Sequence, residues 1–360
     1  MGAVKLSALR KLPGYSDLSP AGRDNLDQVF KKTSRLSKYV APHTYAVSDS
    51  LAKLLQDGRL ESKTDSEGET LLKNLQDLVD NPKLGKQRKN EIFGWTATHL
   101  AFPDETFAQV PGKGTCAPTT IAVDLLQDNP AEFVRLVDGL ADKERQVTLA
   151  NGDPLKRAVR SFSDDSGSGS PVAKILQASF MDYARPDEQY RISSDSFAKE
   201  DDTGLLHDQV ERLTEALHCN DVELRRLASG ELAYALQEVD QTLPSTIRWS
   251  DDSRAEEGSE EKKHSYHMVL LTGCDSQYVY YRNPWGYYSD EYQGPACREV
   301  LENGSERIPL KEFLERQEYV VVPKSLEPGK TAPLPAPEGD TVTETGTQEK
   351  KRGFLGWLFG

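Results

Sequence analysis

Two short stretches of this chain carry residue types that together support nucleophilic chemistry. A cysteine, Cys116, stands in "GKGTCAPTTIAVDLL", and His267 and Asn283 stand in "HMVLLTGCDSQYVYYRNPWG". A thiol attacks a carbonyl well only as a thiolate, so it needs a base within reach, a helix N-terminus, or both to lower a pKa of about 8.5. The candidate nucleophile is therefore the cysteine whose surroundings supply these conditions.

Cys116 is the one of the four cysteines that stands where a helix should begin. Pro118 suits the first turn of a helix, because its missing N–H is not needed there. Gly112 and Gly114 let the backbone approach a substrate closely. The unpaired amides of a first helical turn favour negative charge, on a thiolate or an oxyanion. We expect the other three cysteines to be structural: Cys219, Cys274 and Cys297.

The candidate base is His267, which directly precedes an apolar strand. An antiparallel hairpin that turns near residues 274–276 would place the start of the first strand beside the end of the second, and so His267 beside Asn283. An asparagine carbonyl fixes the orientation and tautomer of an imidazole while the other ring nitrogen faces the thiol. Among the six histidines, we expect His264 to be a solvated neighbour. The rest lie in helical or loop surroundings: His43, His99, His207 and His218.

Both stretches resemble the papain-like cysteine peptidases, in which a histidine is followed sixteen residues later by the asparagine of an Asn-x-Trp-Gly motif. His267 and Asn283 have this separation, and Asn283–Gly286 reads Asn-Pro-Trp-Gly, as in calpains. "TCAPTTIAVDLL" resembles the nucleophile helix of the bacteriocin-processing peptidases of bacterial ABC transporters and their free-standing relatives. "HMVLLTGCD" is similar to their His-x-Val-x-x-x-Gly-Tyr-Asp segment. The resemblance covers about residues 105–323, but only the two motif regions are specific.

The resemblance implies a fold and a set of roles. The fold is α+β, with a helical half that carries Cys116 packed on an antiparallel sheet that carries His267. Cys116 would be the nucleophile, His267 the acid and base, and Asn283 the residue that orients His267. Gln109 and the amide of Cys116 would hold the oxyanion, and Trp285 would shield the His–Asn bond from water. The substrate would be a protein or peptide, with no cofactor and no metal.

Three positions depart from the family pattern. Gln109 lies seven residues before Cys116, where family members have six, and we expect the glycine-rich loop to absorb the extra residue. Ala117 replaces the usual Gly or Trp, and Cys274 stands where the bacterial relatives often have Tyr. None of the three is a member of the expected triad.

The pattern of the chain predicts three regions. Residues 1–95 read as a helical N-terminal region, with a helix start at Ser19-Pro20 and an apolar stripe over residues 71–79 that ends before Asn81-Pro82. Residues 96–323 form the α+β hydrolase domain, in which helical stripes come first. Strands follow late, as "STIRWS", "YHMVLLTG", "QYVYYRN" and "EYVVVP".

Residues 324–360 have the composition of a disordered Pro-rich linker that ends in an aromatic peptide. Five apolar residues follow three basic ones near the end: Phe354, Leu355, Trp357, Leu358 and Phe359. This cluster is too short to span a bilayer but suits docking to a partner or a membrane surface. Folding back on the chain is the alternative, and so is having no role.

Composition narrows the remaining classes. A net charge of −14 argues against nucleic-acid binding, which needs a basic face. No CxxC motif indicates a zinc site, and no apolar run approaches the roughly 20 residues that cross a bilayer. The first residues lack the apolar core of a signal peptide. We expect a cytoplasmic protein, with leaderless export left open.

Three functions remain open on sequence alone. The first is a thiol peptidase, and the second is a transglutaminase, deamidase or acyltransferase of the same fold, as in bacterial effectors and toxins. The third is an inactive binding module. The acidic run at residues 250–263 is either a solvated loop or a mobile rim that favours basic substrates. Residues 1–95 would be an inhibitory pro-segment, a recruiting domain or part of the core.

Overall fold

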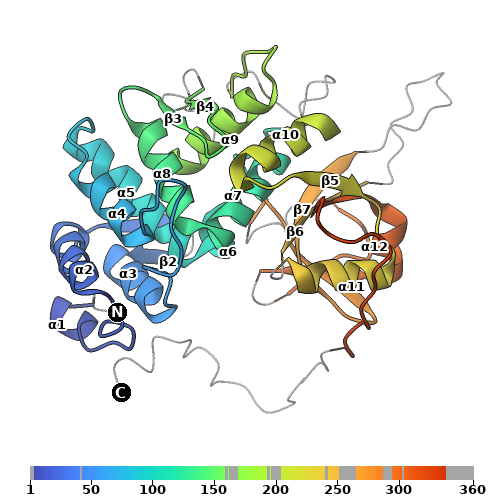
Figure 1. The fold of residues 1–360 in the computed structure, drawn as a ribbon, viewed down its shortest axis with the longest axis horizontal. Coiled ribbons are helices and arrows are strands. Elements are labelled where there is room, and N and C mark those ends of the chain that lie inside the picture. The colour runs from blue at the N-terminus through green and yellow to red at the C-terminus, as the bar shows by residue number, and fades with distance from the viewer. Residues whose placement is uncertain are drawn as a thin grey trace.

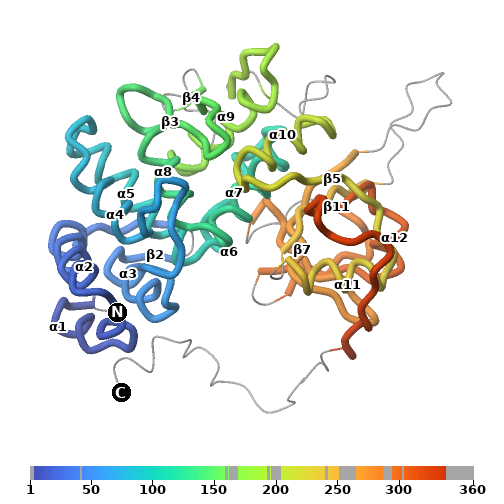
Figure 2. Tube along the Cα trace, viewed as in Figure 1, coloured from blue at the N-terminus to red at the C-terminus, as the bar shows by residue number. Residues whose placement is uncertain are grey.

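The computed structural model describes residues 4–40, 43–158, 161, 169–192, 195, 204–239, 242–250, 265–286, 294–301 and 304–337. Within them, α1–α9 gather on one side of the molecule, and the largest sheet lies on the other side together with α11 and α12; α7 lies between the two sides (Figure 1). Figure 2 shows the same order along the chain, from blue N-terminal helices to orange and red strands. The predicted α+β class is confirmed at this level.

The described helices are α1 (Leu6–Leu9), α2 (Pro20–Thr33), α3 (Val47–Gln56), α4 (Leu71–Asp80), α5 (Lys86–Ala101), α6 (Pro103–Thr106), α7 (Cys116–Asp128), α8 (Pro130–Ala141), α9 (Pro171–Ala184), α10 (His207–His218), α11 (Ser229–Glu238) and α12 (Leu310–Arg316). The described strands are β1 (Ser37–Val40), β2 (His43–Ala46), β3 (Gln146–Thr148), β4 (Pro154–Lys156), β5 (Val222–Arg225), β6 (Leu243–Arg248), β7 (Tyr266–Cys274), β8 (Tyr278–Arg282), β9 (Glu299–Val300), β10 (Glu306–Pro309) and β11 (Gln317–Pro323).

The helix starts follow from local capping. The side chain of Ser19 accepts a hydrogen bond from Gly22 N at 2.9 Å, and Pro20 is the first residue of α2. Asn129 caps α8 in the same way, with Glu132 N 3.1 Å from Asn129 Oδ1. The predicted stripe of α4 is buried over its whole length and ends before Asn81.

The expected seam near residue 95 falls inside α5, which runs without a break from Lys86 to Ala101. The apolar faces of α2–α5 share one core with α7–α10, so the N-terminal helices belong to the same packed half as α7, which begins at Cys116. A boundary between two independently packed regions does not lie inside a continuous helix that contributes to one shared core.

The main sheet has the strand order β5-β11-β6-β7-β8-β10-β9, and every neighbouring pair is antiparallel. Alternation along β7 turns Met268 and Leu270 toward the helical half, whereas Val269 and Leu271 face a second core under α11 and α12. The four predicted strands correspond to β6, β7, β8 and β11. The two-stranded pairs β1–β2 and β3–β4 and the shorter strands of the main sheet were not predicted.

The structure corrects the prediction of disorder for the segment that follows β11, as far as Pro337. Residues 324–337, predicted to be disordered from their prolines, lie against the second core, where Leu326 is buried and Leu334 packs on it. Backbone bonds hold the segment as well, with Ala332 N 2.9 Å from Gly230 O and Ser276 N 3.0 Å from Pro335 O. The prolines reduce the conformational entropy that this segment loses when it becomes ordered. The packing of the two leucines and these hydrogen bonds offset the rest of that loss. The aromatic residues 354–359 lie outside the described residues.

Within the described ranges, the model contains no helix that combines the length and the apolar character needed to cross a membrane.

Candidate active site

Cys116 is the first residue of α7, and its side chain is half-buried where α7 meets β7. Pro118 lies in the first turn, as predicted. Burial raises the pKa of the Cys116 thiol, while hydrogen bonding from the backbone of Met268 and Ala117 acts in the opposite direction. Thr120 Oγ1 donates to Met268 O at 3.1 Å. The first turns of α7 therefore contact both backbone groups of the residue that follows His267.

The loop before Cys116 is held by a buried glutamine on α9 that the sequence analysis did not single out. Gln177 Oε1 accepts from Val110 N at 3.0 Å and from Thr115 Oγ1 at 2.9 Å, and Gln177 Nε2 donates to Ala108 O at 2.8 Å. One side chain thus satisfies three polar groups of the loop. A glutamine in an apolar helical stripe was the available signal, but nothing in the sequence indicates its partners.

Asp195 is a second residue that was missed. Both of its carboxylate oxygens lie 3.0 Å from Gly114 N, and Tyr190 Oη donates to Oδ2 at 2.5 Å. The buried Lys113 ammonium donates to the Asp195 carbonyl at 2.8 Å. Gly112 has a φ of +74°, a conformation that favours glycine. These contacts fix the conformation of the loop that leads into the nucleophile helix.

Gln109, the predicted oxyanion donor, is buried beside this loop. Its backbone N–H lies 2.7 Å from the carbonyl of Pro284, next to Asn283, and its side-chain Nε2 donates to Lys113 O. A carboxamide nitrogen has two hydrogens, so one remains for an oxyanion. Gln109 Oε1 is buried without a hydrogen-bond partner in the described part of the chain.

His267 and Asn283 are brought together as the hairpin predicts. β7 and β8 pair through Leu270↔Arg282, and His267 Nε2 lies 3.0 Å from Asn283 Oδ1. Both side chains are buried, with exposed fractions of 5% for His267 and 1% for Asn283. Their predicted proximity is confirmed.

Hydrogen bonding fixes the orientation of the Asn283 amide. Trp285 N–H donates to Asn283 Oδ1 at 3.0 Å, and Asn283 Nδ2 donates to Glu306 Oε1 at 3.1 Å. A backbone N–H only donates, so Oδ1 must be the oxygen, and His267 Nε2 must carry the proton in the bond to it. A neutral His267 therefore has its lone pair on Nδ1, which is the atom a base needs.

Two tryptophans cover the imidazole. The His267 ring centroid lies 4.4 Å from that of Trp285 and 4.6 Å from that of Trp249. Burial lowers the pKa of His267 to about 4; the bond to Asn283 raises it and the charge of Arg298 lowers it further. Burial thus favours a neutral imidazole on His267 and a neutral thiol on Cys116.

No protein-family model matches this chain, and its sequence matches no curated protein.

The other cysteines have different surroundings. Cys219 is exposed at the end of α10, and Cys297 is half-buried. Burial and the charge of Asp275 raise the pKa of Cys274 to about 11. The acidic residues 251–263 and His264 lie outside the described residues.

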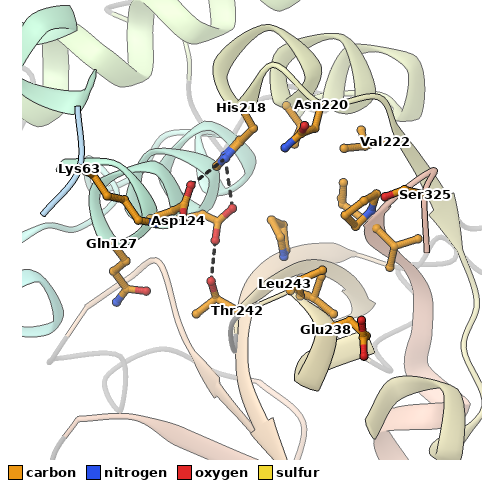
Figure 3. A pocket seen from close by; sticks show the side chains of 17 residues that line it. Lys63, Asp124, Gln127, His218, Asn220, Val222, Glu238, Thr242, Leu243 and Ser325 are labelled. Carbon is orange, nitrogen blue, oxygen red and sulfur yellow. Dashed lines mark hydrogen bonds and ion pairs between the residues drawn. The ribbon is translucent and has the colours of Figure 1, made fainter. Parts of the chain in front are cut away.

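A cavity of about 540 Å³ lies further along α7, and none of the four predicted site residues lines it. Figure 3 shows Asp124 between His218 and Thr242 at this place. Asp124 Oδ2 lies 3.3 Å from His218 Nε2, and Thr242 Oγ1 donates to Asp124 Oδ1 at 2.8 Å. Since Asp124 is on α7, His218 on α10 and Thr242 just before β6, this partly buried cluster joins the helical half to the sheet.

No group of three or more His, Cys, Asp and Glu side chains in the described ranges is arranged to hold a metal ion.

Proposed function

We propose that this chain is a papain-like cysteine hydrolase that cleaves peptide bonds through Cys116, His267 and Asn283. The observation that carries the proposal is the 3.0 Å bond between His267 Nε2 and Asn283 Oδ1, where His267 lies on the strand that packs against the helix beginning at Cys116. This bond leaves Nδ1 as the basic nitrogen, and Met268, the next residue along β7, contacts the thiol of Cys116.

The proposed reaction begins with attack of Cys116 Sγ on the substrate carbonyl carbon. The thiol proton passes to His267 Nδ1, and the oxyanion is held by the amide of Cys116 and the remaining hydrogen of Gln109 Nε2. Collapse breaks the C–N bond, and His267 returns its proton to the leaving amine. Water then attacks the acyl-enzyme, gives a proton to His267 and releases the acid and the thiol. These steps use the groups named above and one water molecule.

Burial determines how the proton moves. It raises the pKa of Cys116 and lowers that of His267 to about 4, so it opposes a preformed ion pair. The proton therefore passes to His267 as the sulfur–carbon bond forms. Asn283 accepts from His267 Nε2 and stabilises the imidazolium of this step.

Product masses test the proposal. The full chain is incubated with a mixed peptide library, with and without an added primary amine, beside Cys116→Ala and His267→Ala. Hydrolysis splits peptides, whereas deamidation of glutamine adds a single mass unit and transamidation adds the amine. Peptide products that disappear in both variants support a peptidase, and intact peptides with shifted masses favour the transferase or deamidase alternative. Products that persist in Cys116→Ala would contradict both.

A further inference from the structure

We propose that Glu306, a buried glutamate on β10, is a positioning residue that sets the proton on His267 by holding Asn283 in one orientation. Its meaning for catalysis rests on the proposed function, but its effect on the imidazole does not. β10 pairs with β8 through Glu306↔Tyr281, so Glu306 reaches the end of the β7–β8 hairpin from the neighbouring strand. The strand order places β10 directly beyond β8, on the side of β8 opposite β7.

Two hydrogen bonds hold the Asn283 amide at its two ends. Glu306 Oε1 accepts from Asn283 Nδ2 at 3.1 Å, and Asn283 Oδ1 accepts from Trp285 N–H at 3.0 Å. A carboxylate only accepts and a backbone N–H only donates, so turning the amide over would break both bonds. With the amide fixed, only the Nε2–H form of His267 completes the bond to Oδ1.

The Glu306 carboxylate is buried inside the protein, and a neighbouring guanidinium balances its negative charge. Glu306 has no exposed surface, and Arg298 Nη1 lies 3.1 Å from the same Oε1. The Arg298 guanidinium also lies 5.7 Å from the ring of Trp249, which packs on His267. A buried ion pair is costly to desolvate and often adds no stability over apolar side chains of similar size. An orientation role accounts for a carboxylate here where an apolar residue would fill the space.

The position of the proton can be read directly. Long-range ¹H–¹⁵N spectra of the full chain, with ¹⁵N-labelled histidine, distinguish Nε2–H from Nδ1–H, and His267→Gln identifies the His267 signals. We expect the Nε2–H form at pH 7 in the unaltered chain. We expect Glu306→Ala to populate the Nδ1–H form, because the amide of Asn283 is then held only at its oxygen, by the N–H of Trp285. Glu306→Gln should retain Nε2–H, since its amide oxygen accepts as the carboxylate does.

The matched control is Glu299→Gln. Glu299 is an exposed glutamate on β9 that pairs with Arg307 at 2.7 Å, and its loss should leave His267 unchanged. Iodoacetamide labelling of Cys116 should slow about tenfold or more in Glu306→Ala and recover in Glu306→Gln, as for other residues that orient a reacting group. Unchanged His99 signals show that each variant is folded.

Two results would overturn the proposal. One is an Nδ1–H tautomer of His267 in the unaltered chain, which needs no variant to fold. The other is a folded Glu306→Ala with the Nε2–H form intact. A tautomer change in Glu306→Ala supports the positioning role even if Cys116 of the unaltered chain labels no faster than other cysteines. That last pattern would count against the proposed function alone.

Discussion

His267 Nε2 and Asn283 Oδ1 lie 3.0 Å apart across the β7–β8 hairpin, and the Asn283 oxygen also accepts from the backbone N–H of Trp285. Both side chains thus belong to one hairpin, and its backbone holds the Asn283 oxygen in place. Its geometry makes Nδ1 of the imidazole the basic nitrogen.

Replacing Asn283 by alanine removes the acceptor of the His267 proton. We expect alkylation of Cys116 at pH 7 to slow roughly 10- to 100-fold, because the imidazole loses its fixed tautomer. Labelling followed by mass spectrometry of the Cys116 peptide measures the rate. Asn151→Ala, on the exposed turn after β3, is the control. Equal rates for Asn283→Ala and the unaltered chain would mean that the 3.0 Å bond does not matter for the thiol.

Removing the Trp285 ring should change the titration of His267. Burial is the main reason that the pKa of His267 lies near 4, so Trp285→Ala should raise it toward the ordinary value of about 6.5. An NMR titration of the His267 ring protons gives the value. Trp95→Ala removes a tryptophan stacked on another buried histidine, His99, and should leave His267 as it was. A pKa that stays near 4 in Trp285→Ala would show that the ring does not exclude water.

We expect Gln177 to stabilise the folded protein by holding the loop that precedes Cys116. Gln177→Leu leaves three buried polar groups of the loop without partners, at a cost of about 1–3 kcal/mol in the free energy of unfolding for each. Urea denaturation measures the loss, with the exposed Gln237→Leu on α11 as control. If the two variants were equally stable, the contacts of Gln177 would contribute little to the fold.

Acid should destabilise the protein through its buried histidines. Burial lowers the pKa of His99 to about 3, so between about pH 6.5 and 3 the unfolded chain binds a proton at this residue that the folded chain does not. The free energy of unfolding should therefore fall as the pH drops through this window, by up to roughly 1.4 kcal/mol per pH unit for this group. His267 adds to the loss in the same direction.

His99→Gln tests this assignment. The amide can still bond Thr106 and Ser170, which lie 3.0 and 2.7 Å from the two ring nitrogens, but it does not titrate. The slope of stability against pH should therefore become shallower, whereas His43→Gln, at an exposed residue, should leave it unchanged. Urea titrations at several pH values between 3 and 7 provide the slopes. Identical slopes in both variants would rule out the buried histidine as the cause.

The contacts that could be predicted from the sequence are those between residues that are close together along the chain. His267 and Asn283 belong to one hairpin with a short turn, so strand pairing alone puts them together. The helix start at Cys116 was equally local, since it follows from Pro118 and the apolar residues after it.

The supporting residues were not predictable because they come from distant segments. Gln177 reaches Thr115 from 62 residues away, and Asp195 reaches Gly114 from 81. Glu306 meets Asn283 only because β10 pairs with β8. No local pattern encodes such contacts, and the burial that shifts the pKa of Cys116 and His267 depends on the same long-range packing.

The most direct test of the central claim is iodoacetamide labelling of the folded, full chain from pH 5 to 8, with the rate at each cysteine read by mass spectrometry. Cys219 is exposed and Cys116 is half-buried, so solvent accessibility alone would make Cys219 react faster. We predict that Cys116 nonetheless labels roughly tenfold faster at pH 7 and keeps a nearly level rate down to pH 5, because His267 takes its proton. His267→Ala should abolish this advantage. A Cys116 that labels no faster than Cys219, or equally fast without His267, would contradict the account.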